Sequence, residues 1–422
     1  MREGREELDG PDLDGRAAWT VAIASVVILT LSYGGPLISV VTMKTIASEL
    51  QTSRSGAAAA AALVYLGAAG GGILAGWLMG KLGISLIVIF GGIMSAAGLI
   101  LAGSGGLWEL YAGHAILMGL FGNAFMFTPL LTYVSRWFER RRGSAVALIS
   151  SGQSVAGAIW PTLITFAIDG IGWRQTMMWY GVLLAVTVVV LAAVFLHAPP
   201  VPSSQAAAAA RQAERSDTVL GLPPNLVMVL LATAILFCCI PMAMPINHVV
   251  AYCGDLGFSA QHGAAMLSLL LGTAFFARQF WGWLCDRIGG LQTLVWASLA
   301  QMTALTGFAL IQDGHVLFAV AVAFGFGQAG LVPAYVIAVR AHYSLQEANW
   351  RIPAVLFGGT LGMAVGGWGA GLIFDFTASY LPAFATGLAF NAANFAILLF
   401  LLGRDRRRDV YTRLIRQPQT ST

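Results

Sequence analysis

Apolar stretches long enough to cross a lipid bilayer follow one another along almost the whole chain. A membrane-spanning helix needs about 20 mainly apolar residues, and the sequence holds twelve such stretches between polar breaks. They lie at residues 18–43, 55–79, 84–103, 107–135, 143–168, 174–196, 225–252, 262–284, 290–311, 315–339, 352–374 and 380–403. Of all residues, 58% are hydrophobic and only 10% are charged, whereas soluble domains carry about 25% charged residues. The sequence therefore predicts an all-α membrane protein with twelve transmembrane helices.

The twelve predicted spans fall into two groups of six. The longest polar break, residues 197–224, is rich in Pro, Ser, Ala and charged residues, which is typical of a linker. Segments 76–83 (GWLMGKLG) and 282–289 (GWLCDRIG) repeat one pattern in the two groups. Parallel repeats of this kind place a substrate site at their interface in transporters. We expect an N-terminal tail at 1–17, six-helix bundles at 18–196 and 225–403, the linker 197–224 between them, and a C-terminal tail at 404–422.

Basic residues gather on one side of this predicted topology. If the N-terminus is cytoplasmic, nearly all of the 23 Lys and Arg residues fall in cytoplasmic segments. Lys44, Arg54 and Arg174 then fall in outer loops, and Arg278 lies inside a span. Cytoplasmic loops of membrane proteins carry such an excess of positive charge. We expect a multi-pass protein of the cell inner membrane or plasma membrane, with both termini in the cytoplasm and its first span retained in the mature protein.

Catalytic and cofactor motifs are missing from the predicted spans. The four cysteines, Cys238, Cys239, Cys253 and Cys285, lie in or beside apolar segments without metal-ligand spacing. The spans hold no nucleophile–base pair and no phosphate-cradling loop. A membrane-embedded enzyme or receptor therefore has no support in the sequence. We expect no cofactor, no metal, no nucleic-acid partner and no obligate protein partner, with membrane lipid as the surrounding medium.

A short loop motif links the chain to a known superfamily. Gly282, Asp286 and Arg287 lie at the end of the eighth predicted span, and their pattern resembles the signature that the major facilitator superfamily carries after its second and eighth helices. The copy after the second span has Gly80 in place of the aspartate. The resemblance implies the major facilitator fold of two six-helix bundles. It also implies a conformational latch formed by these three residues and Arg136, although an ordinary polar loop is the alternative.

Three further segments resemble the monocarboxylate porters, a family within that superfamily. They are Asp14–Gly15 before the first span, the basic segment Arg136–Ala145 at the entry to the fifth, and Phe276–Arg278 in the eighth. The resemblance implies a secondary transporter of small monocarboxylates such as lactate or pyruvate, with a proton as co-transported ion, and we expect a bacterial member. The related oxalate/formate antiporters share parts of these segments, so an organic-anion exchanger of that type is the alternative.

Arg278 is the most informative single residue. No other Lys or Arg lies in the interior of a predicted span, since Arg174 is the first residue of the sixth, and no Asp or Glu lies deep in one. It precedes Asp286 by eight residues, or about 12 Å along a helix. A charge at that depth costs at least a few kcal/mol and must face a cavity or a partner. Because the spans hold no fixed anion, we expect Arg278 to bind the substrate carboxylate through paired hydrogen bonds. A structural arginine bonded to backbone carbonyls, or reaching the membrane interface, is the alternative.

Other polar residues in the spans are candidates for the same site. Tyr33, Asn123 and Tyr335 lie in spans that line the cavity in this superfamily, and each side chain can bind a carboxylate or hydroxyl, or instead link two helices. His248 is a candidate for substrate binding and for proton coupling, because histidine titrates near physiological pH. A hydrogen-bonded histidine at the membrane interface is the alternative. Asp255, seven residues later, is the second proton-coupling candidate.

Two residues typical of animal monocarboxylate transporters are replaced in this chain. Leu37 stands where those proteins have a lysine after the proline of the first helix, and Ala274 where they have an aspartate four residues before the arginine of the eighth. Both usual proton-coupling groups are therefore absent. The eleventh span also lacks the lysine of the oxalate antiporters. A single fixed cation favours a monoanion over a dianion, and proton symport rests on the resemblance alone.

Overall fold

Helices make up nearly all of the chain that the structure describes. The computed structural model describes residues 14–134, 136–138, 145, 148–197, 218–343 and 345–416. The helices are α1 (Arg16–Val41), α2 (Met43–Glu49), α3 (Arg54–Leu82), α4 (Ile84–Ser104), α5 (Leu107–Ala112), the π-helix η1 (Gly113–Asn123), α6 (Ala124–Val134), α8 (Gly152–Phe195), α10 (Pro224–Asp255), α11 (Ala260–Ile288), α12 (Gly290–Leu310), α13 (Gly314–Ala329), α14 (Leu331–His342), α15 (Leu345–Thr377) and α16 (Leu381–Arg416). Within the described ranges, the β-structure is one isolated bridge between Val219 and Leu222.

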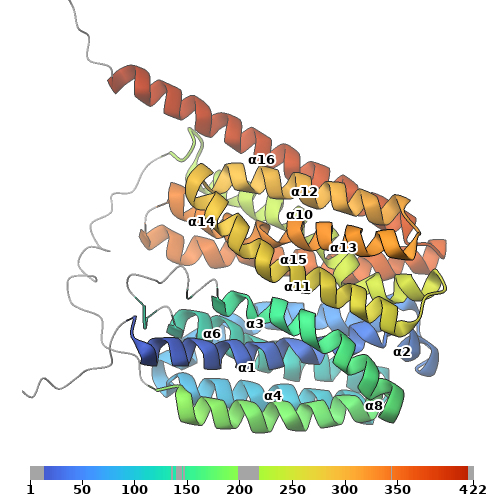
Figure 1. The fold of residues 1–422 in the computed structure, drawn as a ribbon. Helices are drawn as coiled ribbons and strands as arrows, with labels where there is room; N and C mark the ends of the chain where they lie inside the picture. The colour runs from blue at the N-terminus through green and yellow to red at the C-terminus, as the bar shows by residue number, and fades with distance from the viewer. Residues whose placement is uncertain are drawn as a thin grey trace, which may run out of the picture.

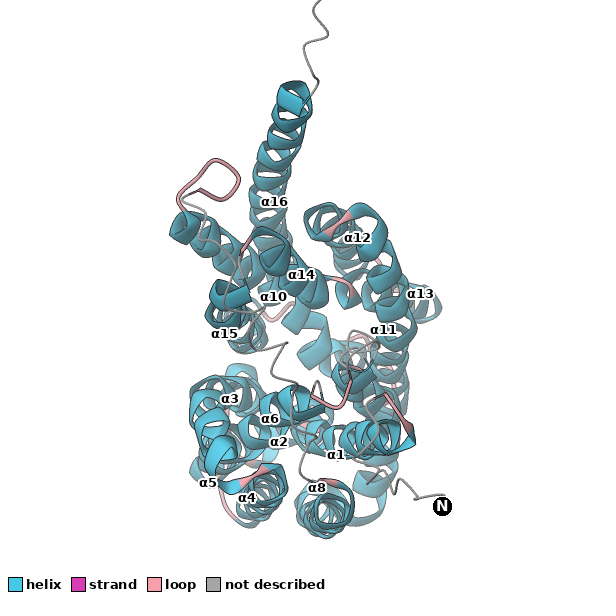
Figure 2. Cartoon of the chain, turned by 90° about the vertical axis from the view of Figure 1, so that its left-hand side faces the viewer, coloured by secondary structure: helices cyan, strands magenta, loops and turns pink. Residues whose placement is uncertain are grey.

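The helices form two bundles that lie side by side. Helices α1 to α8 form one bundle and α10 to α16 the other, as the ribbon in Figure 1 and the end-on view in Figure 2 show. Helix α3 packs against α15, and α8 packs against α11, so these pairs join the two bundles. The predicted all-α architecture of two helical bundles is confirmed. The exact domain boundaries stay a prediction, because most of the linker 197–224 lies outside the described residues.

Eleven described stretches are long and apolar enough to cross a membrane. One of them, Leu148–Phe195, has 48 residues, which would measure about 72 Å as a single straight helix, far more than the roughly 30 Å of a bilayer core. Gly172 divides it, because its φ of 76° and ψ of 163° are not helical. Glycine adopts a positive φ without the steric penalty of a Cβ. The stretch therefore supplies two crossings, which gives the twelve spans that the sequence predicts.

The fourth span contains a feature that the apolar pattern did not predict. It consists of α5, the 11-residue π-helix η1 and α6 in continuous succession. Wide helical turns of this kind are rare and often occur at functional sites. Close packing surrounds the π-helix, since a Cβ added to Gly71 of α3 would lie 2.0 Å from the carbonyl oxygen of Leu120. Small residues let neighbouring helix backbones approach in this way.

The two bundles touch closely at one end of the molecule. We call the end that holds α2 the distal end; it lies at the right of Figure 1, opposite the start of α1 and the end of α16. A Cβ added to Gly371 of α15 would lie 2.9 Å from the Cα of Ser55 on α3. We call the opposite end, where α1 begins, the proximal end. Contacts across the distal end therefore hold the bundles together there.

Candidate functional site

A small cavity lies between the two bundles. Helices α1, α3, η1 and α8 of the first bundle and α10 and α11 of the second contribute to its wall. Its lining residues are Tyr33, Pro36, Leu37, Val40, Ala61, Val64, Tyr65, Asn123, Gln153, Ile246, Asn247 and Leu271. The cavity volume is about 40 Å³, and a water needs about 10–15 Å³ by the same measure. The space therefore fits a solute of only a few heavy atoms.

Two of the predicted site residues line this cavity. Tyr33 lies on α1, where its ring packs edge-on against Phe127 at a centroid distance of 5.9 Å. Asn123 is the last residue of the π-helix, and its Oδ1 accepts a 2.6 Å hydrogen bond from the Ser32 hydroxyl. This bond leaves the Asn123 amide N–H₂ as a donor group at the cavity wall. The two side chains bring a hydroxyl and an amide to one enclosed space.

Arg278 lies on the proximal side of the cavity. It follows the cavity residue Leu271 by seven positions on α11, which is two helical turns, or about 10 Å, along the same face. Its Nη1 donates a 2.5 Å hydrogen bond to the Ser150 carbonyl oxygen, which belongs to the other bundle. The Tyr33 phenol lies close enough for an electrostatic interaction with the guanidinium. Arg278 therefore sits where the two bundles meet, beside the polar cavity.

One hydrogen-bonding edge of the Arg278 guanidinium has no partner among the residues that the structure describes. Its Nε is buried and has no hydrogen-bond partner among the described residues. In the described part of the chain, Arg278 also takes part in none of the ion pairs. A buried donor left unpaired costs about 1–3 kcal/mol, and more when the group is charged. The bond to the Ser150 carbonyl is the kind of contact that a purely structural arginine would make. The Nε–Nη2 edge makes no such contact among the described residues, so it can bind the two oxygens of a carboxylate side by side.

Tyr335 lies away from the cavity. Its side chain is fully buried in the second bundle, and its hydroxyl donates a 2.6 Å hydrogen bond to Oδ1 of Asn394 on α16. The Asn394 amide in turn donates to Ser298 of α12 at 2.9 Å. In this structure Tyr335 therefore links helices, which is the other role that its sequence position allowed.

His248 and Asp255 lie near the distal end, apart from Arg278. The His248 ring is fully buried, with Nε2 2.7 Å from the Gly367 carbonyl oxygen and Nδ1 3.0 Å from the Tyr380 hydroxyl. Asp255 ends α10, where it forms ion pairs with Lys44 at 2.7 Å and with Arg54 at 2.8 Å. Asp255 therefore belongs to a contact between the bundles, whereas the partners of His248 lie in its own bundle.

The predicted latch residues lie at the proximal end, and the three charged ones are exposed. Asp286 and Arg287 are exposed, and the Arg287 guanidinium stacks over the Trp283 ring at 4.2 Å. Gly282 faces open space, since a Cβ there would meet nothing within 4 Å. Arg136 is also exposed. Within the part of the chain that the structure describes, none of the three charged residues forms an ion pair, so the latch remains a prediction.

Several residues of the site were not singled out from the sequence. Tyr65, Gln153 and Asn247 line the cavity, yet a lone polar residue in an apolar span carries no periodic signal. Arg54 and Tyr380 were likewise missed, because their roles depend on contacts between segments far apart in the chain. Their positions at the ends of predicted spans were the one available signal.

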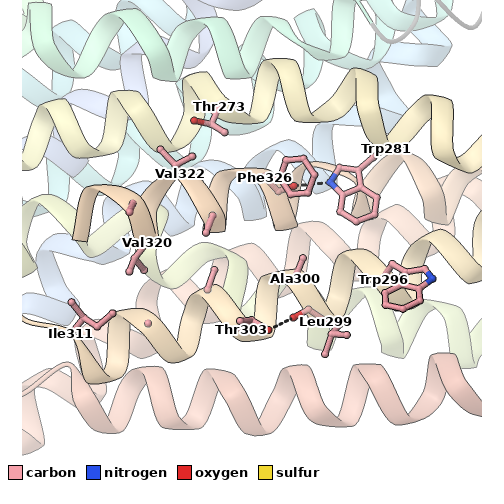
Figure 3. Close-up of a pocket in the computed structure, with 14 residues that line it drawn as sticks. Thr273, Trp281, Trp296, Leu299, Ala300, Thr303, Ile311, Val320, Val322 and Phe326 are labelled. Carbon is pink, nitrogen blue, oxygen red and sulfur yellow. Dashed lines mark hydrogen bonds between the residues drawn. The ribbon is translucent and has the colours of Figure 1, made fainter. Parts of the chain in front are cut away.

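A larger groove lies elsewhere, among α11, α12 and α13. Figure 3 shows its residues, with Thr273 and Trp281 on one side and Trp296 and Ile311 on the other. Its volume is about 870 Å³ and its wall is mainly apolar. The Trp281 indole N–H is already bonded to the Phe326 carbonyl oxygen at 2.7 Å. Trp296 is 58% exposed, as expected of a surface that faces lipid. The groove offers no charged group for an anion, so the smaller cavity between the bundles is the better candidate site.

Residues 21–349 of the chain match the family described as the Major Facilitator Superfamily. The chain belongs to this superfamily. Monocarboxylate transporter 13 of Rattus norvegicus is similar to it, with 27% identity over 76% of this chain and 74% of that protein. Monocarboxylate transporter 4 of Gallus gallus shares 24% identity over 89% of this chain and 81% of its own length. These relatives come from animals, and a similar transporter is fungal, so they do not support the expected bacterial source.

Solved transporter structures share the fold of this major facilitator. A mutant of peptide transporter POT in complex with alafosfalin matches with a TM-score of 0.70 and 15% identity, covering 94% of this chain and 96% of that one. A bacterial homologue of the lysosomal transporter Spinster, inward-facing and occupied, matches with a TM-score of 0.62 and 15% identity over 93% and 96% of the two chains. At this identity the likeness shows the fold alone. The relatives and folds are those of transporters, which points away from an enzyme.

Proposed function

We propose that the protein is a secondary active transporter that carries small monocarboxylates, such as lactate or pyruvate, together with a proton by alternating access. The observation that carries this proposal is the free edge of Arg278. A cation that is partly buried between the bundles, with no carboxylate bonded to it among the described residues, suits an anionic ligand. The named relatives are monocarboxylate transporters, and this supports the choice of anion.

The size and polarity of the neighbouring cavity favour a small substrate. A space of about 40 Å³ suits a lactate-sized solute better than a peptide or a nucleoside. The Tyr33 hydroxyl and the Asn123 amide are groups that can hydrogen-bond a hydroxyl or keto oxygen next to a carboxylate. A ligand that bridges from Arg278 to these two side chains would contact both bundles at once. Binding would then couple directly to the relative position of the bundles.

Alternating access follows from where the bundles are tied together. In this structure the contacts between the bundles at the distal end close that side of the cavity, so substrate exchange would occur through the proximal side. Rocking of the bundles about a fixed central site would open the other side. If both termini are cytoplasmic, as the charge distribution predicts, the distal end faces outward and the state shown is closed to the outside.

A proton explains how an anion can be accumulated in a cell with a negative interior. Moving one negative charge inward is opposed by about 2.3 kcal/mol per 100 mV. Co-transport of one proton makes the cycle electrically neutral, so the pH gradient becomes the driving force. With Leu37 and Ala274 in place of the usual charged groups, the proton must use other residues or the substrate itself.

Competition for uptake tests the proposed substrate class. Labelled lactate uptake into proteoliposomes is measured with unlabelled acetate, pyruvate, oxalate and succinate as competitors at one pH. We expect the monoacids to compete better, because the second carboxylate of a diacid would be desolvated near Arg278 without a partner, at a cost of several kcal/mol. Stronger inhibition by the diacids, or uptake that requires a counter-anion inside the vesicles, would contradict the proposal and favour an oxalate/formate-type exchanger.

A further inference from the structure

Six side chains form a continuous set of polar contacts across the distal end. We call them the distal clasp: Lys44, Arg54, His248, Asp255, Asp375 and Tyr380. Lys44 and Arg54 belong to the first bundle, and the other four belong to the second. The Arg54 guanidinium donates through Nη1 and Nη2 to the two Asp255 oxygens, at 3.0 and 2.8 Å. This is the paired geometry that makes arginine–carboxylate contacts strong and directional.

The clasp also holds the beginning of α3 by its backbone. The Asp375 carboxylate accepts hydrogen bonds from the N–H groups of Arg54 at 2.8 Å and Ser55 at 2.9 Å. These groups lie in the first turn of α3, where backbone N–H groups lack partners inside the helix and the helix dipole favours a negative charge. The Arg54 guanidinium also lies 4.5 Å from the Phe374 ring centroid. A residue of one bundle thus caps a helix of the other.

Tyr380 connects the Arg54–Asp255 pair to His248. Its hydroxyl oxygen accepts a 3.1 Å hydrogen bond from Arg54 Nη1, and the same hydroxyl lies 3.0 Å from His248 Nδ1. His248 Nε2 lies 2.7 Å from the Gly367 carbonyl oxygen, and a carbonyl can only accept, so Nε2 carries a proton. In the neutral ring Nδ1 is then an acceptor. The Tyr380 hydroxyl therefore donates to His248 while it accepts from Arg54. Each hydrogen-bonding atom in this series, from Arg54 Nη1 to the Gly367 carbonyl oxygen, has a partner.

A second proton on His248 conflicts with this arrangement. Nδ1–H would become a donor pointed at an oxygen that already accepts from Arg54, and the tyrosine hydrogen would lose its acceptor. The charged groups around the ring are Arg54 on α3, Lys44 on α2, Asp255 on α10 and Asp375 on α15, two of each sign. Tyr252 and Tyr380 are the neighbouring phenols. An imidazolium in this fully buried position would add an unbalanced positive charge one oxygen atom away from the Arg54 guanidinium.

We propose that the distal clasp is a proton-operated gate, closed when His248 is neutral and released when His248 Nδ1 takes up a proton. Release frees Arg54 from Tyr380 and lets the two bundles separate at the distal end. Closure returns His248 to the neutral form and expels the proton. Because the clasp cannot close around the protonated ring, this proton returns to the distal side, so the gate responds to the pH on that side, and the co-transported proton must cross on another group or on the substrate carboxylate. This inference goes beyond the proposed function and names a pH-sensing site that controls access to the same cavity.

Distance measurement between the bundles tests the gate without any substrate. Spin labels on Thr45→Cys of α2 and Ala260→Cys of α11 report the separation across the distal end by pulsed electron paramagnetic resonance. Both positions are exposed, and the four native cysteines are buried. In the full chain reconstituted into lipid nanodiscs, we expect the ratio of open to closed molecules to rise about tenfold or more from pH 8 to pH 5. The reason is that a protonated His248 and the Arg54 guanidinium would repel each other a few ångströms apart in a low dielectric.

His248→Gln is the decisive variant. A glutamine amide can donate to Gly367 and accept from Tyr380, as the neutral imidazole does, but it cannot take up a proton. We expect this variant to stay closed at every pH. His315→Gln is the matched control, because His315 is an exposed histidine at the same end, outside the clasp. It should keep the full response to pH.

Three outcomes would overturn the gate: no pH response in the parent protein, a full response in His248→Gln, or loss of the response in His315→Gln as well. Should His248→Gln fail to insert, Tyr380→Phe tests the same link, and an unweakened response there would contradict the proposal. The outcomes remain separable from those for the substrate. An intact pH response without lactate uptake contradicts the proposed function alone, whereas proton-driven lactate uptake without a pH response contradicts the gate alone.

Discussion

Arg278 carries the proposed function through the geometry of its guanidinium. One nitrogen, Nη1, is fixed by the Ser150 carbonyl at 2.5 Å, and the buried Nε has no partner among the described residues. The bond to Ser150 orients the group so that the Nε–Nη2 edge is preset rather than free to rotate. Preset donors lose less entropy when a ligand binds. The structural contact and the proposed binding role are therefore compatible in one side chain.

Replacement of Arg278 should strongly reduce uptake whether or not the positive charge is kept. In Arg278→Gln the cation is lost, and in Arg278→Lys a point charge replaces the planar fork that fits a carboxylate. Loss of a charge-assisted pair costs about 1.5–3 kcal/mol, so we expect lactate uptake at low concentration to fall about tenfold or more in both. Initial uptake rates into proteoliposomes, normalised to inserted protein, provide the measurement.

Arg406→Gln is the control for this pair. Arg406 lies on the exposed extension of α16, away from the cavity, so its loss should leave uptake unchanged. Near-normal uptake by Arg278→Gln would show that the arginine is structural and that the substrate carboxylate binds elsewhere.

Helix α2 shows how a short element outside the spans fixes the distal end. Glu49, its last residue, accepts hydrogen bonds from the Trp173 indole N–H at 2.5 Å and from Arg174 Nε at 2.8 Å. Arg174 also donates to the Gly105 carbonyl oxygen just after α4. The hydrogen bonds from Trp173 and Arg174 lower the pKa of the Glu49 carboxyl. One carboxylate thus joins α2, α4 and the second half of α8.

Glu49→Gln should destabilise the protein in a pH-dependent way. A carboxyl whose pKa is lower in the folded state contributes stability above its unfolded pKa and loses it as pH falls through the folded value. Glu49 is partly exposed and the pair is screened, so we expect the melting temperature at pH 7 to fall by roughly 1–2 °C. The difference from the parent should vanish at acid pH. Thermal unfolding in detergent at several pH values measures it, and a pH-independent difference would assign the effect to packing instead.

At the scale of the whole molecule, the sequence was sufficient for the fold but not for the contacts between bundles. Twelve apolar stretches predicted twelve crossings, including the two that meet at Gly172. Helix α2 and the π-helix were missed, because neither changes the apolar pattern of the span beside it. Arg54 and Asp255 are 201 residues apart, and nothing local in either segment indicates their pairing. Such contacts depend on how the bundles dock, and they leave no repeating pattern of apolar and polar residues from which they could be predicted.

The same reasoning explains which site residues were found. Arg278 was conspicuous because a charge in a span is costly and demands a reason. Tyr33 and Asn123 were selected by their spans and do line the cavity. Tyr335 was selected in the same way, yet it bonds to Asn394 inside one bundle. A span can be assigned to the cavity from sequence, but the face that a polar side chain occupies depends on helix rotation set by packing.

Accumulation of lactate driven by a proton gradient is the most direct test of the central claim. Purified protein in liposomes is given labelled lactate with the outside at pH 6 and the inside at pH 7.5, then the same without a gradient and with a protonophore. We expect accumulation above equilibrium only with the gradient, at a ratio that follows the proton ratio of about thirtyfold. Protein-free liposomes and the Arg278→Gln variant set the background for passive entry. Accumulation that survives the protonophore, or that follows sodium or an internal counter-anion instead, would contradict proton-coupled monocarboxylate transport.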